Sequence, residues 1–97
     1  MAPIETQLRE LYSLSDGKNV SLLELSLLLF ASRKDRVSVR EMAKMTGWHE
    51  TTVSTASKKL VDLELIDRVY PAEGGYRRLV LMERGERFLE LVKEMLQ

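Results

Sequence analysis

The sequence predicts a mainly α-helical domain with one small β-hairpin (α+β), in the order α-α-(β)-α-α-β-β-α. Three observations lead to this fold class. Residues 38–66 contain two helical stretches joined by a turn with Gly, apolar residues recur at helical spacing on either side, and residues 66–82 are β-prone. A chain of 97 residues fits one domain, so we expect residues 1–97 to fold as a single unit.

Two helices are predicted in the first third of the chain. The apolar residues that mark one face of the first helix are Ile4, Leu8, Leu11 and Leu14. A polar loop follows, so that residues 1–19 form an N-terminal helix and loop. Ser21 and Glu24 form a capping box that opens a Leu-rich helix. This helix is apolar on nearly every side and must be buried on every side, which implies a partner surface. Residues 37–39 are compatible with a short strand.

Residues 38–66 carry the clearest local signals. Ser38 is a favourable N-cap, and Glu41 stands where a capping-box carboxylate returns the bond. Gly47 is placed to end this helix in a left-handed conformation. A second helix is predicted at residues 50–65, and its inward-facing residues are Val53, Ala56, Leu60 and Leu63. Two helices joined by a short turn with Gly are typical of a helix-turn-helix.

The periodicity changes after this motif. Residues 66–70 and 76–82 are β-prone and flank a turn-like segment with two Gly, so we expect a hairpin, or wing, at residues 66–82. Residues 83–97 return to a helical pattern. A helix-turn-helix followed by a hairpin and a closing helix makes a winged helix-turn-helix domain.

Composition excludes several classes of function. The chain has no Cys and a single His, and Val53 breaks the HExxH pattern that His49 and Glu50 would begin. No Gly-rich phosphate loop is present either, so we expect no enzyme, no metal site and no cofactor. The fifteen basic and fifteen acidic residues cancel, which argues against a protein held on DNA by bulk charge alone.

Two further expectations concern the environment of the protein. No signal peptide is visible, and the longest apolar stretch is too short to span a bilayer, so we expect a cytoplasmic protein. One Asn and two Gln beside 31% charged residues resemble the composition of thermophile proteins.

Residues 20–96 resemble the MarR-type winged-helix regulators. The similarity is carried by the run Thr52-Val53-Ser54-Thr55 in the second helix of the motif and by Gly85 at the start of the last helix. The shortened form is closest to the compact archaeal or archaeal-virus type. The chain departs from the family pattern at His49 and Met82, where capping side chains are usual. The resemblance implies a homodimer built by the first and last helices, with the recognition helix and wing on double-stranded DNA, and a role in transcription regulation.

The exposed residues of the motif and wing are the predicted DNA contacts. Helix 50–65 would enter the major groove, and the wing would reach the adjacent minor groove or the backbone. The predicted DNA-binding residues are Ser38, Arg40, His49, Glu50, Thr51, Thr52, Ser54, Thr55, Lys58, Lys59, Arg77 and Arg78. The exposed helix face lacks Arg, Asn and Gln, which supply bidentate base contacts, so we expect modest direct readout. Residues 33–44 hold five Lys and Arg against two Asp and Glu, a local charge of +3 suited to phosphates.

Dimerisation is predicted at the two terminal helices. The predicted interface residues are Ile4, Leu8, Leu11, Phe88, Val92 and Met95.

The resemblance also leaves room for a small-molecule effector between the dimer helices and the DNA-binding lobe, although no residue pattern indicates one. The alternative reading is a winged-helix module that binds another protein through the Leu-rich helix within a larger assembly. Trp48 could be a binding residue, but it is expected in the core, packed against Val53.

Overall fold

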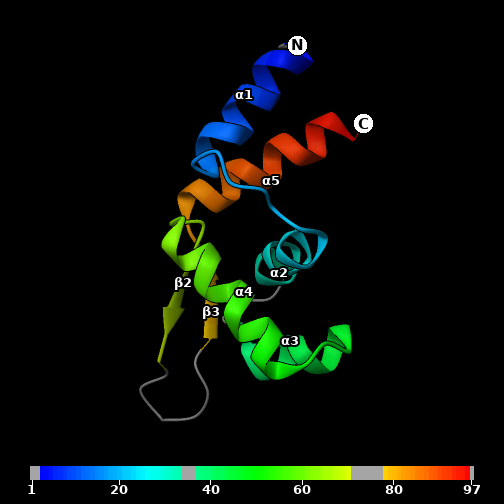
Figure 1. The fold of residues 1–97 in the computed structure, drawn as a ribbon, viewed down its shortest axis with the longest axis vertical. Coiled ribbons are helices and arrows are strands. Elements are labelled where there is room, and N and C mark those ends of the chain that lie inside the picture. The colour runs from blue at the N-terminus through cyan, green and yellow to red at the C-terminus, as the bar shows by residue number, and fades with distance from the viewer. Residues whose placement is uncertain (1–2, 34–36, 71–77, 97) are drawn as a thin grey trace.

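A computed structural model describes residues 3–33, 37–70 and 78–96 of the chain and confirms the predicted fold class (Figure 1). In chain order the elements are α1 (Ile4–Leu14), α2 (Leu22–Arg33), β1 (Val37–Ser38), α3 (Val39–Thr46), α4 (Glu50–Asp62), β2 (Ile66–Val69), β3 (Arg78–Leu81) and α5 (Glu83–Met95). Across the described ranges this is a winged helix-turn-helix, with α3 and α4 as the motif and β2 and β3 as the strands of the wing.

The three strands form a small antiparallel sheet in the order β1-β3-β2. β2 and β3 pair from Ile66 opposite Leu81 to Val69 opposite Arg78. On the other edge of β3, β1 places Ser38 opposite Arg78. The short strand considered at residues 37–39 is therefore real, and it ties the start of α3 to the base of the wing. Residues 71–77, where the sequence predicts the turn of the wing, lie outside the described residues.

Local capping explains where the helices begin and end. Ser21 N–H donates to Glu24 Oε1 at 2.7 Å, and Glu24 N–H donates to Ser21 Oγ at 3.2 Å, which confirms the predicted capping box before α2. Ser38 is the N-cap of α3, because its Oγ accepts from Glu41 N–H at 3.0 Å. Gly47 ends α3 with φ of 78°, the left-handed conformation that a side chain disfavours.

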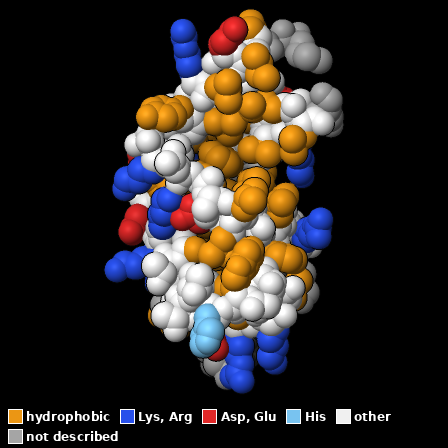
Figure 2. All heavy atoms as spheres, turned by 45° about the vertical axis from the view of Figure 1, so that its right-hand side comes forward, with side chains coloured by type: hydrophobic (Ala, Val, Ile, Leu, Met, Phe, Trp, Pro, Cys, Tyr) orange, Lys and Arg blue, Asp and Glu red, His pale blue; other side chains and the backbone are white. Residues whose placement is uncertain are grey.

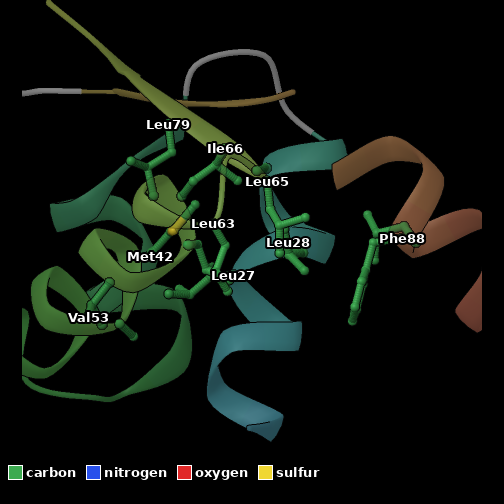
Figure 3. Close-up of a cluster of buried hydrophobic side chains, with 13 residues drawn as sticks. Leu27, Leu28, Met42, Val53, Leu63, Leu65, Ile66, Leu79 and Phe88 are labelled. Atoms are coloured by element: carbon green, nitrogen blue, oxygen red, sulfur yellow. The ribbon is translucent and has the colours of Figure 1, made fainter. Parts of the chain in front are cut away.

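The hydrophobic core gathers around α2 (Figure 3). Side chains from α2, α3, α4, β2, β3 and α5 contribute to it. Those with no exposed surface include Leu27, Leu28, Met42, Val53, Leu60, Leu65 and Leu79. The chain itself covers most of α2, since four more of its apolar residues are half-buried against the core: Leu23, Leu25, Leu29 and Phe30. Leu22, in the first turn of this helix, remains 82% exposed.

The molecule is elongated, with extents of 45 × 25 × 23 Å. α1 and α5 lie at one end and α3 at the other (Figure 1). Polar contacts fasten α1 to α5. Arg87 donates from Nε to Glu10 Oε2 at 2.6 Å and from Nη2 to Oε1 at 3.0 Å, while Gln7 Nε2 donates to Glu94 Oε2 at 3.1 Å. Arg84 Nη2 donates to the Leu14 carbonyl at 2.6 Å. The two terminal helices therefore form one lobe, separated along the long axis from the helix-turn-helix.

Candidate nucleic-acid interface

The turn between α3 and α4 is fixed by its own hydrogen bonds. Gly47 N–H donates to the Ala43 carbonyl at 2.9 Å, and Trp48 N–H donates to Thr46 Oγ1 at 3.3 Å. The same Thr46 hydroxyl donates to the Met42 carbonyl at 2.7 Å. His49 occupies the N-cap position of α4, as predicted, but its side chain makes no capping hydrogen bond. The His49 side chain therefore does not cap the backbone amide groups in the first turn of α4. Amide groups at the start of a helix can bind an anion.

α4 has one buried face and one exposed face. The buried face consists of Val53, Ala56, Ser57 and Leu60. The exposed side chains on the opposite face are those of Glu50, Thr51, Thr52, Thr55 and Lys58. The Thr55 hydroxyl donates to the Thr51 carbonyl at 3.0 Å, which leaves its oxygen lone pairs and methyl group toward solvent. Five of the predicted DNA-binding residues thus share one continuous polar surface.

Three other predicted contacts are placed differently. Ser38 is only 4% exposed, and its hydroxyl is occupied as the cap of α3. Ser54 is half-buried, because it stands between the two faces of α4. Lys59 turns toward α2, where its Nζ lies 3.0 Å from the buried Glu24 carboxylate and also donates to the Asn19 carbonyl. That ion pair stabilises the packing of α4 on α2 and draws the Lys59 ammonium away from the exposed face.

Exposed basic side chains lie on α3 and at the start of β3. Arg40 and Lys44 are exposed on α3 and line a shallow hollow together with His49 and Glu50. Arg78 is exposed at the start of β3, directly opposite Ser38 in the sheet register. The structure therefore brings the wing strand beside the start of α3. Arg77, the other predicted wing contact, lies outside the described residues.

The expectation that Trp48 is a core residue is wrong. Its side chain is 39% exposed and lines the same hollow as Arg40 and Lys44. The neighbours that share this hollow include Ala43 and Gly47, which are too small to cover an indole ring. The position of Trp48 before α4 suggested a core residue, but Gly47 directly before it and Ala43 on α3 were the available signal that the ring would stay at the surface.

The predicted dimer residues on the terminal helices differ in how far they are buried. Ile4 and Leu8 are 55% and 49% exposed on α1. Leu11, Val92 and Met95 are half-buried. Phe88 is 6% exposed within the core of the chain, so little of its surface is left for a partner. Figure 2 shows hydrophobic side chains in a band that runs along this face from the end of the molecule where α1 and α5 lie.

Within the described ranges, no group of three or more His, Cys, Asp or Glu side chains could hold a metal ion. In the same part of the chain, no helix is long and apolar enough to cross a membrane. The exposed side chains around α4 are mainly polar and basic, whereas the terminal helices also expose apolar side chains.

Comparison with known proteins rests on structure, because no family model and no curated protein matches the sequence. MarR superposes with a TM-score of 0.74 at 23% identity, over 89% of this chain and 61% of that chain. The transcriptional regulator BldR from Sulfolobus solfataricus gives 0.70 at 22% identity, over 96% of this chain and 70% of its own. MepR from S. aureus, solved as a complex with DNA, gives 0.71 at 20% identity, over 97% and 79%.

The chain has the MarR-type winged-helix fold. It spans about 55–64% of the length of three further matched proteins, including RV1404 from Mycobacterium tuberculosis. The matches to MarR, BldR and MepR cover 89–97% of this chain.

Proposed function

We propose that this protein binds double-stranded DNA as a homodimer and regulates transcription. The observation that carries the proposal is the exposed polar face of α4, together with the exposed basic side chains of Lys44 on α3 and Arg78 at the start of β3. In helix-turn-helix proteins the second helix enters the major groove while the first crosses the backbone. The structure of MepR, which has the same fold, was solved with DNA.

The side chains on this face suit phosphates and methyl groups more than base edges. Hydroxyls of Thr51, Thr52 and Thr55 reach phosphates, and Thr methyl groups contact thymine. Lys58 is the strongest candidate for a base-edge contact, and Glu50 can accept from cytosine. Among the residues placed differently, Ser38 and Lys59 would support the interface through the cap of α3 and the packing of α4.

The apolar side chains at the other end of the molecule support the homodimer. Ile4 and Leu8 expose half of their surface on α1, and Val92 is half-buried on α5, the helix that α1 contacts. A two-fold contact there would place two copies of α4 on one side of DNA, with half-sites about 34–36 Å apart. Leu11 and Met95 lie on the same two helices and would extend this contact.

The direct experiment measures binding to a short duplex by fluorescence anisotropy at several salt concentrations. Lys58→Ala should weaken binding through loss of its base-edge contact, by about 1–3 kcal/mol for each copy bound. Lys18→Ala is the matched control, because Lys18 is an exposed cation in the loop between α1 and α2. Arg78→Ala tests the wing in the same assay.

The alternative, a winged-helix module that binds another protein, is supported by the zero net charge and by the exposed Leu22. It makes the opposite prediction in this assay. Binding that is absent at low salt, or equal losses for Lys58→Ala and Lys18→Ala, would reject the DNA-binding proposal and favour the alternative.

We also infer that the protein works in the cytoplasm and belongs to the compact archaeal or archaeal-virus type, from a thermophile. The low content of Asn and Gln and the abundance of charged residues support this inference. The likeness to BldR from Sulfolobus solfataricus agrees with it.

A further inference from the structure

The turn before α4 exposes an apolar surface that the proposed contacts leave unexplained. Trp48 is 39% exposed and Met45, on the last turn of α3, is 51% exposed. Single exposed apolar residues are common on protein surfaces, but an aromatic ring of this size is costly to leave in water and is enriched where partners bind. Trp48 is also the only Trp of the chain, so its environment can be observed without interference.

The backbone fixes where this ring stands. The left-handed Gly47 sets the turn, and the bond from Trp48 N–H to Thr46 Oγ1 holds the peptide in place. Trp48 comes two residues before Glu50, where α4 begins. It therefore lies between the helix that crosses the DNA backbone and the helix that enters the groove in proteins of this architecture.

The surroundings of the ring match a phosphate chain. Lys44 and Arg40 on α3 line the same hollow, and His49 stands next to Trp48 at the start of α4. Lys44 and Arg40 offer positive charge and N–H donors, and Glu50 is the one acidic residue among the described residues that line the hollow. An indole adds an apolar face for a sugar ring and one N–H donor.

Building on the proposed function, we propose that Trp48 contacts DNA through the sugar–phosphate backbone. The indole face packs on a deoxyribose at the edge of the major groove, and its Nε1–H donates to the neighbouring phosphate, beside Lys44. Because sugars and phosphates are the same at every base pair, this contact positions α4 and carries no direct sequence information. It adds affinity through apolar burial, which salt does not screen.

The expected size of the effect follows from the exposed area of the ring. With 39% of the residue exposed, on the order of 100 Å² is available, and covering about half of it corresponds to roughly tenfold in Kd for each copy bound. Trp48→Ala should therefore weaken binding about tenfold per copy, equally on duplexes of different sequence, without changing the salt slope. Lys44→Ala, in contrast, should lower the slope by about one per copy.

The experiment combines these Kd values with the emission of Trp48. In the wild-type protein, titration with duplex DNA should change the emission and protect the ring from acrylamide quenching. Met82→Ala is the matched control, because Met82 is also 39% exposed but lies between β3 and α5. Trp48→Phe keeps a smaller apolar ring without the N–H and should lose only part of the affinity. Thermal unfolding of each variant separates loss of binding from loss of folding.

Each outcome decides the proposal. Unchanged quenching on DNA overturns the contact even where Trp48→Ala fails to fold, because that measurement uses the wild-type chain. Equal Kd for wild type, Trp48→Ala and Trp48→Phe overturns it as well, and in both cases DNA binding itself stands. A loss confined to one base sequence replaces the backbone contact with a base contact. If the wild-type chain binds no duplex at low salt, the proposed function fails and this contact fails with it.

Discussion

Replacing Gly85 by Ala tests how closely α5 must approach Leu65, in the segment that joins α4 to β2. A Cβ at this position would lie 2.0 Å from the Leu65 carbonyl oxygen and 2.8 Å from Leu81 Cδ1. Real Cβ atoms essentially never come within 3.0 Å of such atoms, so helix and carbonyl must separate by about 1 Å. The carbonyl cannot easily yield, because it also accepts from Met82 N–H at 3.0 Å.

The expected loss of stability can be worked from these contacts. Overpacking against a buried backbone costs about 3 kcal/mol, the upper part of the usual range. The better helix propensity of Ala returns about 1 kcal/mol, which leaves a net loss of about 2 kcal/mol. For a domain of this size that corresponds to a fall in Tm of roughly 8–16 °C.

Thermal unfolding followed by circular dichroism measures this effect. The control is Glu86→Ala, an exposed position one residue further along α5, which should stay within about 0.5 kcal/mol of wild type. If Gly85→Ala melts at or above the wild-type temperature, helix propensity governs this site and the inferred close approach is absent.

Four further predictions rest on other parts of the structure. Lys59→Ala leaves the buried Glu24 carboxylate without its ammonium partner. It should lower the free energy of unfolding by about 1–2 kcal/mol, less than for a fully buried pair, because Lys59 is 34% exposed. Lys58→Ala is the control, and equal urea midpoints for the two variants would show that the ion pair contributes nothing. The hydrogen bond from Arg87 lowers the pKa of the Glu10 carboxyl below its ordinary 4.5. The stability that this bond contributes is therefore present above pH 4.5 and lost as pH falls through the lowered pKa. Arg87→Ala should flatten the acid part of the plot of Tm against pH, and identical plots for the variant and the wild type would contradict this prediction. Leu8→Glu places a charge on the proposed dimer surface and should yield a monomer in sedimentation at micromolar concentration, whereas an unchanged mass would move the interface elsewhere. A chain from a thermophile should unfold above the 45–65 °C typical of mesophile domains, so a Tm inside about that range would count against such a source.

The sequence predicts the helix-turn-helix well because its signals are local. The caps at Ser21 and Ser38 are satisfied within three residues, and Gly47 acts through its own backbone. Such features need no knowledge of the rest of the fold. They explain why the element order and the wing strands agree with the structure, although no family model matches the chain.

The residues that the sequence could not place depend on distant partners. Lys59 lies on the margin of the exposed face of α4 by helical geometry, yet it pairs with Glu24, 35 positions earlier. The exposure of Trp48 depends on how little Ala43 and Gly47 cover it. Phe88 is apolar and on the terminal helix, as an interface residue would be, but the packing of α5 on the rest of the chain buries it. Helical periodicity gives the face of a residue and leaves its partner undetermined.

The position of Lys59 sharpens what the proposed function requires of α4. The helix contains no Arg, Asn or Gln, and its two Lys residues are Lys58 and Lys59. With Lys59 held by Glu24, Lys58 is left as the basic side chain of the exposed face. One Lys per copy can distinguish few base pairs, since each good base contact is worth about 1–3 kcal/mol of discrimination. On the proposed function, specificity must therefore come mainly from the spacing of two copies of α4 and from the DNA shape that the wing meets. A selection from random duplexes should accordingly yield a strong two-fold spacing with weak base preference under α4, and several strongly selected G·C pairs there would contradict this division of roles.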